Sequence, residues 1–176
     1  MNELNQKTLV NRVAQSPLKT INLEVYYPQE DIVELDIKQY LFKDLLLKEK
    51  DFRRSLKEED WSVFSEKRVC VFCSSDAIIP VWAYMLIASY LKELAVDVFQ
   101  GTKREYLKHH YSQVIESKDW SVYEGGMLVI KGCSDKPVPP SAYMALTSAL
   151  LPYVKSLMYG EPCSTVPIYK RPKNPK

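Results

Sequence analysis

Three cysteines of this chain are each followed by a serine in a segment that is predicted to be a loop. They are Cys73, Cys133 and Cys163. Thiolate sulfurs are the usual protein ligands of iron–sulfur clusters and are common ligands of zinc. Three converging cysteines could hold a metal ion with one open position. A metal site, a packed turn without chemistry, and a reactive thiol are the three interpretations that these loops leave open.

Polar residues follow the first two cysteines closely and are candidates for contact with a bound cofactor. These candidates are Ser74, Asp76, Ser134 and Asp135. Asp76 or Asp135 could also supply a fourth metal ligand. Each aspartate precedes a proline and the start of a predicted helix, where a carboxylate caps the helix and complements its dipole. Helix capping is therefore the default role that we expect for both aspartates.

The fourth cysteine, Cys70, forms a CxxC motif with Cys73. Residues three apart on a strand point to opposite faces, so Cys70 is expected in the core while Cys73 leaves the strand. A thioredoxin-type CxxC lies instead at the start of a helix, where the helix dipole lowers the thiol pKa. This motif is therefore not predicted to be a redox or metal-binding pair.

A cysteine nucleophile needs a base, and the sequence offers few candidates. Its two histidines, His109 and His110, are neighbours on a predicted amphipathic helix and are expected at the surface. The sequence contains no HExxH, GxSxG or phosphate-loop motif. No reaction can be named from these residues, and enzymatic activity stays an open question.

The segments around the first two cysteines resemble each other. VFCSSDAIIPVWAYM (71–85) and IKGCSDKPVPPSAYM (130–144) both read as strand, Cys-Ser loop and helix. A DWSV motif begins at Asp60 and again at Asp119, an offset of 59, whereas Cys73 and Cys133 are 60 apart. The pattern predicts an internal duplication, with halves of approximately 44–95 and 96–160. In parallel α/β sheets, loops at such strand ends line the ligand crevice.

Strands that alternate with helices predict an α/β fold, a layered sheet with helices in a single domain over 1–176. The two tandem strand-helix-strand-helix repeats follow an N-terminal helix at 3–15 and a hairpin of strands at 18–28 and 31–37. Further strands are predicted at 45–49, 68–73, 96–100 and 127–132. Helices are predicted at 50–60, 79–95, 103–118 and 141–159, before a flexible basic tail at 170–176.

Composition excludes some classes of function. The 176 residues carry a net charge of +2, which predicts no strong attraction to nucleic acid or to an anionic membrane. The longest apolar stretch, from Ala77 to Leu91, is shorter than the ~20 residues that a membrane span needs. The first residues lack the apolar core of a signal peptide. We therefore expect a cytoplasmic protein whose cysteines are free thiols or metal ligands rather than disulfides.

Three motifs, CSSDAIIPVWAYM, IKGCSDKPVPPSAYM and VKSLMYGEPCSTVPIYKR, resemble the bacterial domain-of-unknown-function family numbered 2480. The resemblance covers nearly the full chain. It implies a stand-alone cytosolic protein from a family without an established activity, whose genes often lie beside iron–sulfur cluster assembly genes. It also implies that cysteines recur at the positions of Cys73, Cys133 and Cys163, whereas the residue at Cys70 varies.

These observations lead to three hypotheses from different classes. The first is an accessory protein that binds zinc or an iron–sulfur species through Cys73, Cys133 and Cys163, with iron–sulfur assembly proteins as partners. Its setting in cluster assembly rests on the resemblance alone. The second is a cysteine-dependent enzyme or sulfur-transfer protein that uses Cys73 or Cys133. The third is a protein-interaction module without chemistry, which forms a homodimer through its aromatic-rich helices.

Overall fold

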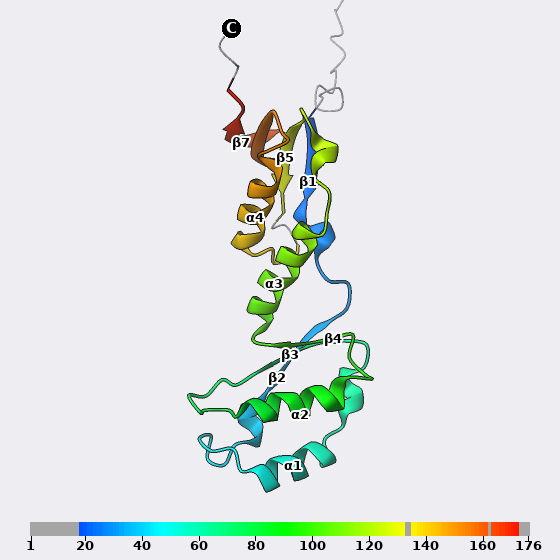
Figure 1. The fold of residues 1–176 in the computed structure, drawn as a ribbon, viewed down its shortest axis with the longest axis vertical. Coiled ribbons are helices and arrows are strands. Elements are labelled where there is room, and N and C mark those ends of the chain that lie inside the picture. The colour runs from blue at the N-terminus through cyan, green and yellow to red at the C-terminus, as the bar shows by residue number, and fades with distance from the viewer. Residues whose placement is uncertain (1–17, 133–134, 162, 173–176) are drawn as a thin grey trace, which may run out of the picture. The chain divides into compact units, whose positions relative to one another are not determined.

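The computed structural model describes residues 18–132, 135–161 and 163–172. The chain divides into two compact units: an inserted unit of residues 28–110, and a flanking unit of residues 1–27 and 111–176. Each unit has its own sheet with helices packed on it (Figure 1), which confirms the predicted α/β class. The single domain over 1–176 and the repeat halves at 44–95 and 96–160 stay predictions. The predicted N-terminal helix lies outside the described residues.

The inserted unit contains a three-stranded parallel sheet in the order β2-β3-β4. Its strands and helices are β2 (Ile32–Asp36), α1 (Glu49–Glu58), β3 (Arg68–Phe72), α2 (Val81–Leu91) and β4 (Asp97–Gln100). Both helices lie on one face of the sheet (Figure 1), where Val69 and Val71 of β3 join their apolar core. The central strand is apolar along most of its length because both of its faces are buried.

The flanking unit contains a four-stranded sheet in the order β1-β5-β6-β7. Its strands are β1 (Leu18–Asn22), β5 (Met127–Lys131), β6 (Ser156–Glu161) and β7 (Ser164–Lys170). The first three are parallel, and β7 runs antiparallel to β6. The helix α4 (Pro140–Leu150) connects β5 to β6, and α3 (Lys103–Glu116) contributes its last turns to this unit.

Each DWS motif has the same structure in its own unit. Asp60 and Asp119 accept a hydrogen bond from the backbone N–H two residues later, at 3.0 and 2.9 Å, and so begin the short 3-10 helices η3 (Trp61–Phe64) and η4 (Ser121–Tyr123). The indole N–H of Trp61 donates to the Leu56 carbonyl at 2.7 Å, and that of Trp120 donates to the Ile115 carbonyl at 2.8 Å. Each tryptophan thus fixes its motif to the end of the preceding helix.

The first strand of each sheet shows a second correspondence, which the sequence analysis missed. Asn22 ends β1 and Asp36 ends β2, and each side chain accepts a hydrogen bond from the backbone N–H two residues later. Each begins a 3-10 helix, η1 (Leu23–Tyr26) or η2 (Ile37–Tyr40), whose first residue is fully buried. The two units therefore share strand, 3-10 helix, α-helix, 3-10 helix, strand and α-helix in the same order.

The helices α2 and α4 bury equivalent positions. Three residues at a spacing of four face the core of each helix, and all six are at most 1% exposed: Ala83, Ile87 and Leu91 in α2, and Ala142, Leu146 and Leu150 in α4. Such spacing places side chains along one stripe of a helix. The crossover helices therefore pack on their sheets through matching apolar stripes.

Three of the predicted elements are wrong. The strands at 18–28 and 31–37 form no hairpin, because β1 pairs with β5 and β2 pairs with β3 in different sheets. The helix at 141–159 ends at Leu150 just before Pro152, which cannot donate a backbone hydrogen bond, and Ser156–Glu161 forms β6. Residues 45–49 form no strand, since a tight turn joins Phe42 to Leu46.

No helix in the described ranges is long and apolar enough to cross a membrane. The longest apolar stretch of the sequence forms the 11-residue helix α2 and the loop before it.

Replacing a residue of the α2 stripe tests this packing. Ile87→Ala removes a fully buried side chain and is expected to lower the free energy of unfolding by about 2–5 kcal/mol. Met85→Ala is the matched control on the same helix, because Met85 is 67% exposed, and its effect should stay within about 0.5 kcal/mol. Urea denaturation followed by circular dichroism measures both. Equal losses in the two variants would contradict the described core.

Candidate thiol site and apolar cavity

Cys73 lies at the carboxyl edge of the parallel sheet in the inserted unit. It directly follows Phe72, the last residue of the central strand β3, and its side chain is half-buried. Cys70 lies inside the same strand and is fully buried. The prediction that Cys70 belongs to the core while Cys73 leaves the strand is confirmed. The CxxC spacing therefore does not bring the two thiols together.

Polar side chains from two segments, the loop after β3 and helix α2, lie near the Cys73 thiol. The sulfur lies 3.2 Å from the hydroxyl oxygen of Ser75, within hydrogen-bonding distance. Tyr84, on the first turn of α2, is close enough for the charge of a Cys73 thiolate to act on its hydroxyl group. Burial raises the pKa of Tyr84, the thiolate charge raises it further, and a hydrogen bond with the Gln100 side chain partly offsets both effects. The thiol thus lies in a partly enclosed polar environment.

Asp36 holds the loop that begins at Cys73. Its carboxylate accepts hydrogen bonds from the backbone N–H groups of Ser74, at 3.0 Å, and Lys38, at 2.9 Å. Burial raises the pKa of Asp36, but the hydrogen bonds from Ser74 and Lys38 outweigh burial and leave this pKa below its usual value. Ser74, a predicted cofactor contact, is thus engaged in fixing the loop to the end of β2.

The helix-capping role predicted for Asp76 and Asp135 is wrong. Helix α2 begins after Pro80 and helix α4 after Pro139, and neither helix start has a side-chain capping bond. A proline needs no hydrogen-bonding partner for its nitrogen, and its fixed φ suits the entry into a helix. Both aspartate side chains are exposed, and the backbone N–H of Asp135 donates to the Glu24 carboxylate at 3.1 Å. Their cofactor role stays a prediction.

Cys163 belongs to the flanking unit. It lies between β6 and β7, is exposed, and forms no disulfide. The ends of β5 and β6 meet at this edge of the sheet, where the Lys131 ammonium lies 3.3 Å from the Glu161 carboxylate. Cys133 and Ser134 lie outside the described residues. Cys73 and Cys163 are thus placed in different units, each at the carboxyl edge of its own sheet.

Strand register identifies the residue of the flanking unit that corresponds to Cys73. Phe72 pairs with Asp36 in one sheet, and Lys131 pairs with Asn22 in the other, so the next residues, Cys73 and Gly132, are equivalent. A Cβ atom at Gly132 would lie 2.6 Å from the Tyr143 hydroxyl oxygen, so a side chain there would require that hydroxyl group to move. The alignment of Cys73 with Cys133 in the sequence is therefore shifted by one residue from the structural correspondence.

No three histidine, cysteine, aspartate or glutamate side chains come together as a metal ion would require, within the part of the chain that the structure describes. Neither histidine belongs to such a cluster among the described residues. His109 is exposed and stacks on the Phe99 ring, with a centroid distance of 5.5 Å, and His110 is half-buried. The expected surface position of the histidines is confirmed. A metal site built from the predicted cysteines would need Cys133 and both units.

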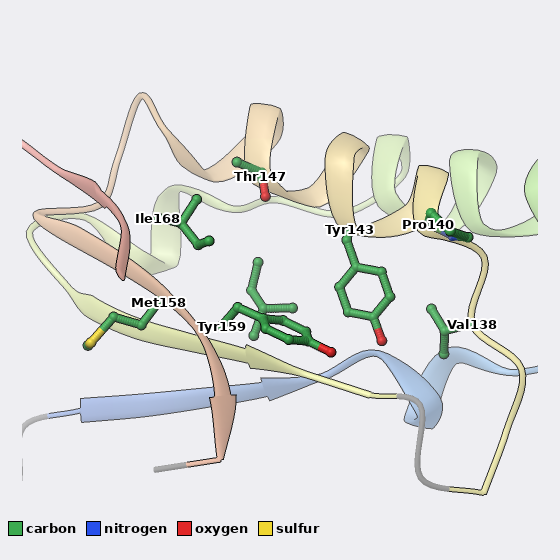
Figure 2. A pocket seen from close by; sticks show the side chains of 8 residues that line it. Val138, Pro140, Tyr143, Thr147, Met158, Tyr159 and Ile168 are labelled. Carbon is green, nitrogen blue, oxygen red and sulfur yellow. The ribbon is translucent and has the colours of Figure 1, made fainter. Parts of the chain in front are cut away.

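The flanking unit contains a cavity of about 380 Å³ between α4 and the strands β5, β6 and β7. Figure 2 shows most of its lining residues, which are Ile130, Val138, Pro140, Tyr143, Thr147, Met158, Tyr159 and Ile168. The Tyr143 and Tyr159 rings meet edge to face, with centroids 5.7 Å apart. The sequence does not indicate this cavity, because the residues of β6 read as part of a long helix and β7 is not predicted as a strand.

Comparison with known proteins agrees with the motifs in the sequence. The model of a protein family of unknown function, DUF2480, matches residues 7–171. The chain belongs to the DUF2480 family. No curated protein and no solved structure matches the chain. The suspected family is therefore confirmed, and the function has to be argued from the residues of this member of DUF2480.

The buried thiol of Cys70 predicts a loss of stability at alkaline pH. Burial raises the pKa of Cys70 to about 11, above the value of about 8.5 for a thiol in an unfolded chain. The folded state therefore holds this proton more tightly. The contribution of the Cys70 thiol to the free energy of unfolding is complete below about pH 8.5 and is lost as the pH rises toward 11.

Urea denaturation at about pH 8 and about pH 10 is expected to show a fall of roughly 1–2 kcal/mol from this group. Cys70→Val, which has no titrating group, should show a smaller fall over the same range. An equal fall in Cys70→Val and in the unchanged protein would show that the Cys70 thiol is not the cause.

Proposed function

We propose that this DUF2480 protein is a non-enzymatic accessory protein that binds zinc or an iron–sulfur species through the thiolates of Cys73, Cys133 and Cys163. Its setting is iron–sulfur cluster assembly in the bacterial cytoplasm, with assembly proteins as partners. Ser74, Asp76, Ser134 and Asp135 flank the ligands. Nucleic acid and membranes are not among its partners. Asp76, Asp135 or a hydroxyl group supplies the fourth ligand.

The observation that carries this proposal is the place of the thiols in the fold. Cys73 follows the central strand of one sheet, and Cys163 follows β6 of the other, both at carboxyl edges. Loops at that edge are where α/β sheets bind ligands. Neither thiol is fully buried and neither is oxidised, so both are accessible to a metal ion. The proposal requires Cys73 and Cys163 to meet, together with Cys133, when the metal is bound.

A second candidate is a sulfur-transfer protein with Cys73 as the acceptor. The Ser75 hydroxyl and the nearby Tyr84 give this thiol polar neighbours that could hold a transferred sulfur atom. The Cys73 thiolate would attack the outer sulfur of a donor persulfide. The sulfur–sulfur bond of the donor breaks, the donor leaves as a thiolate, and a persulfide remains on Cys73. No external oxidant or reductant is needed for this exchange.

Metal analysis of the protein distinguishes these candidates. The full chain is purified anaerobically without a metal-affinity tag, and its metal content, sulfide content and visible spectrum are recorded. About one metal ion or cluster per chain is expected. Cys73→Ala, Cys133→Ala and Cys163→Ala should each lose it, because a site with three thiolates does not tolerate the loss of one.

Cys70→Ala is the matched control, because it removes a buried cysteine that is not a proposed ligand, and it should keep the metal. Retention of metal in all three ligand variants would contradict the proposal. A metal-free protein in which a small-molecule persulfide adds one sulfur atom to Cys73, detected by mass spectrometry, would favour the second candidate instead.

A further inference from the structure

The cavity of the flanking unit exists because β7 makes the sheet wider than its helix cover. In the inserted unit, β4 is the edge strand of the sheet, whereas the equivalent strand β6 is followed by β7 in the flanking unit. Ile168 of β7 and Tyr159 of β6 therefore extend the apolar floor beyond α4. They remain 52% and 41% exposed, which leaves apolar surface in water. Covering such surface is favourable, by about 25 cal/mol per Å².

The lining is mainly apolar, and two of its three hydroxyl groups, those of Tyr143 and Tyr159, form a polar end (Figure 2). No charged side chain lines the cavity among the residues that the structure describes. Figure 2 shows the hydroxyl groups of Tyr143 and Tyr159 at the end near Val138, whereas Thr147 and Ile168 lie toward the other end. Ligand cavities commonly combine apolar walls with a few polar groups that orient the ligand. A volume of about 380 Å³ is near the lower end of their usual range of about 300–1,000 Å³.

Gly132 keeps the polar end of the cavity open. Its missing side chain makes room for the Tyr143 hydroxyl, since a Cβ there would lie only 2.6 Å from that oxygen. The corresponding position of the inserted unit holds Cys73. The position after the central strand thus carries a thiol in one unit and, in the other, a glycine that leaves room for a tyrosine hydroxyl.

We propose that this cavity, between α4 and the β5-β6-β7 strands, binds a small uncharged molecule that is mainly apolar or aromatic and carries one hydroxyl or carbonyl group. The polar group of the ligand lies beside the Tyr143 and Tyr159 hydroxyls, and its apolar part packs on Ile168 and Thr147. An uncharged ligand is required because the lining offers no opposite charge to a buried ion. This proposal does not rest on the proposed thiolate ligands.

Titration with 2-naphthol, a fluorescent molecule of this class, tests the proposal on the full chain at neutral pH. Saturable binding of one molecule per chain is expected. Thr147→Phe fills the cavity and should weaken binding about tenfold or more. Ala88→Phe is the matched control, because Ala88 is the exposed residue of α2 that lies 59 positions before Thr147, and it should leave binding unchanged.

The class of ligand is tested by two further measurements. Tyr159→Phe removes one hydroxyl group and should weaken 2-naphthol binding about twofold to tenfold while leaving the binding of 2-methylnaphthalene unchanged. Naphthalene-2-sulfonate should bind at least about tenfold more weakly than 2-naphthol, because its charge would be buried without a partner.

Absence of saturable 2-naphthol binding, or equal affinity in Thr147→Phe, would overturn the proposal. Equal binding of the sulfonate would overturn the assignment of an uncharged ligand. If instead NMR signals of the lining residues shift with protein concentration and 2-naphthol does not bind, the cavity is an interface with a second copy, and the proposal fails.

Discussion

Parallel strand pairing is the constraint on which the rest of this structure depends. Each central strand, β3 or β5, lies between two parallel neighbours, and a parallel connection requires a crossover long enough to contain a helix. The crossover helix must then bury an apolar stripe on its sheet, as α2 and α4 do. The same pairing brings the carboxyl ends of neighbouring strands to one edge. The positions of Cys73 and Cys163 are consequences of this topology.

The two units share one framework but carry different residues at its carboxyl edge. Matching asparagine, aspartate and tryptophan hydrogen bonds fix the strands and turns in both units. Two of their differences lie at the carboxyl edge and in the added strand β7. One unit has Cys73 with polar neighbours at the end of its central strand, and the other has Gly132, Tyr143 and an apolar cavity beside β7. Different sites on one shared framework are common among α/β folds.

Much of the framework was predictable, because the apolar pattern within a short segment indicates whether it forms a strand or a helix. Continuous apolar runs predicted β3 and β5, and alternation of strand and helix predicted the class. The prediction of a hairpin failed because the parallel partners of β1 and β2 lie far away in sequence. Leu18 pairs with Met127, about 109 residues later, and Ile32 pairs with Arg68, about 36 residues later. The prediction of one helix over 141–159 failed because the apolar residues after Pro152 suit a strand as well as a helix. The roles of Ser74 and Gly132 depend on neighbours such as Asp36 and Tyr143, which no local pattern specifies.

The central claim is that Cys73, Cys133 and Cys163 supply the sulfur ligands of one metal ion. X-ray absorption at the zinc edge, on the full chain loaded anaerobically with an equimolar amount of zinc, tests it most directly. The account predicts a first shell with about three sulfur atoms near 2.3 Å, and it predicts that this sulfur shell is lost in Cys163→Ala, which no longer holds the metal. A first shell of nitrogen and oxygen alone, or a sulfur count that Cys163→Ala leaves unchanged, would contradict it.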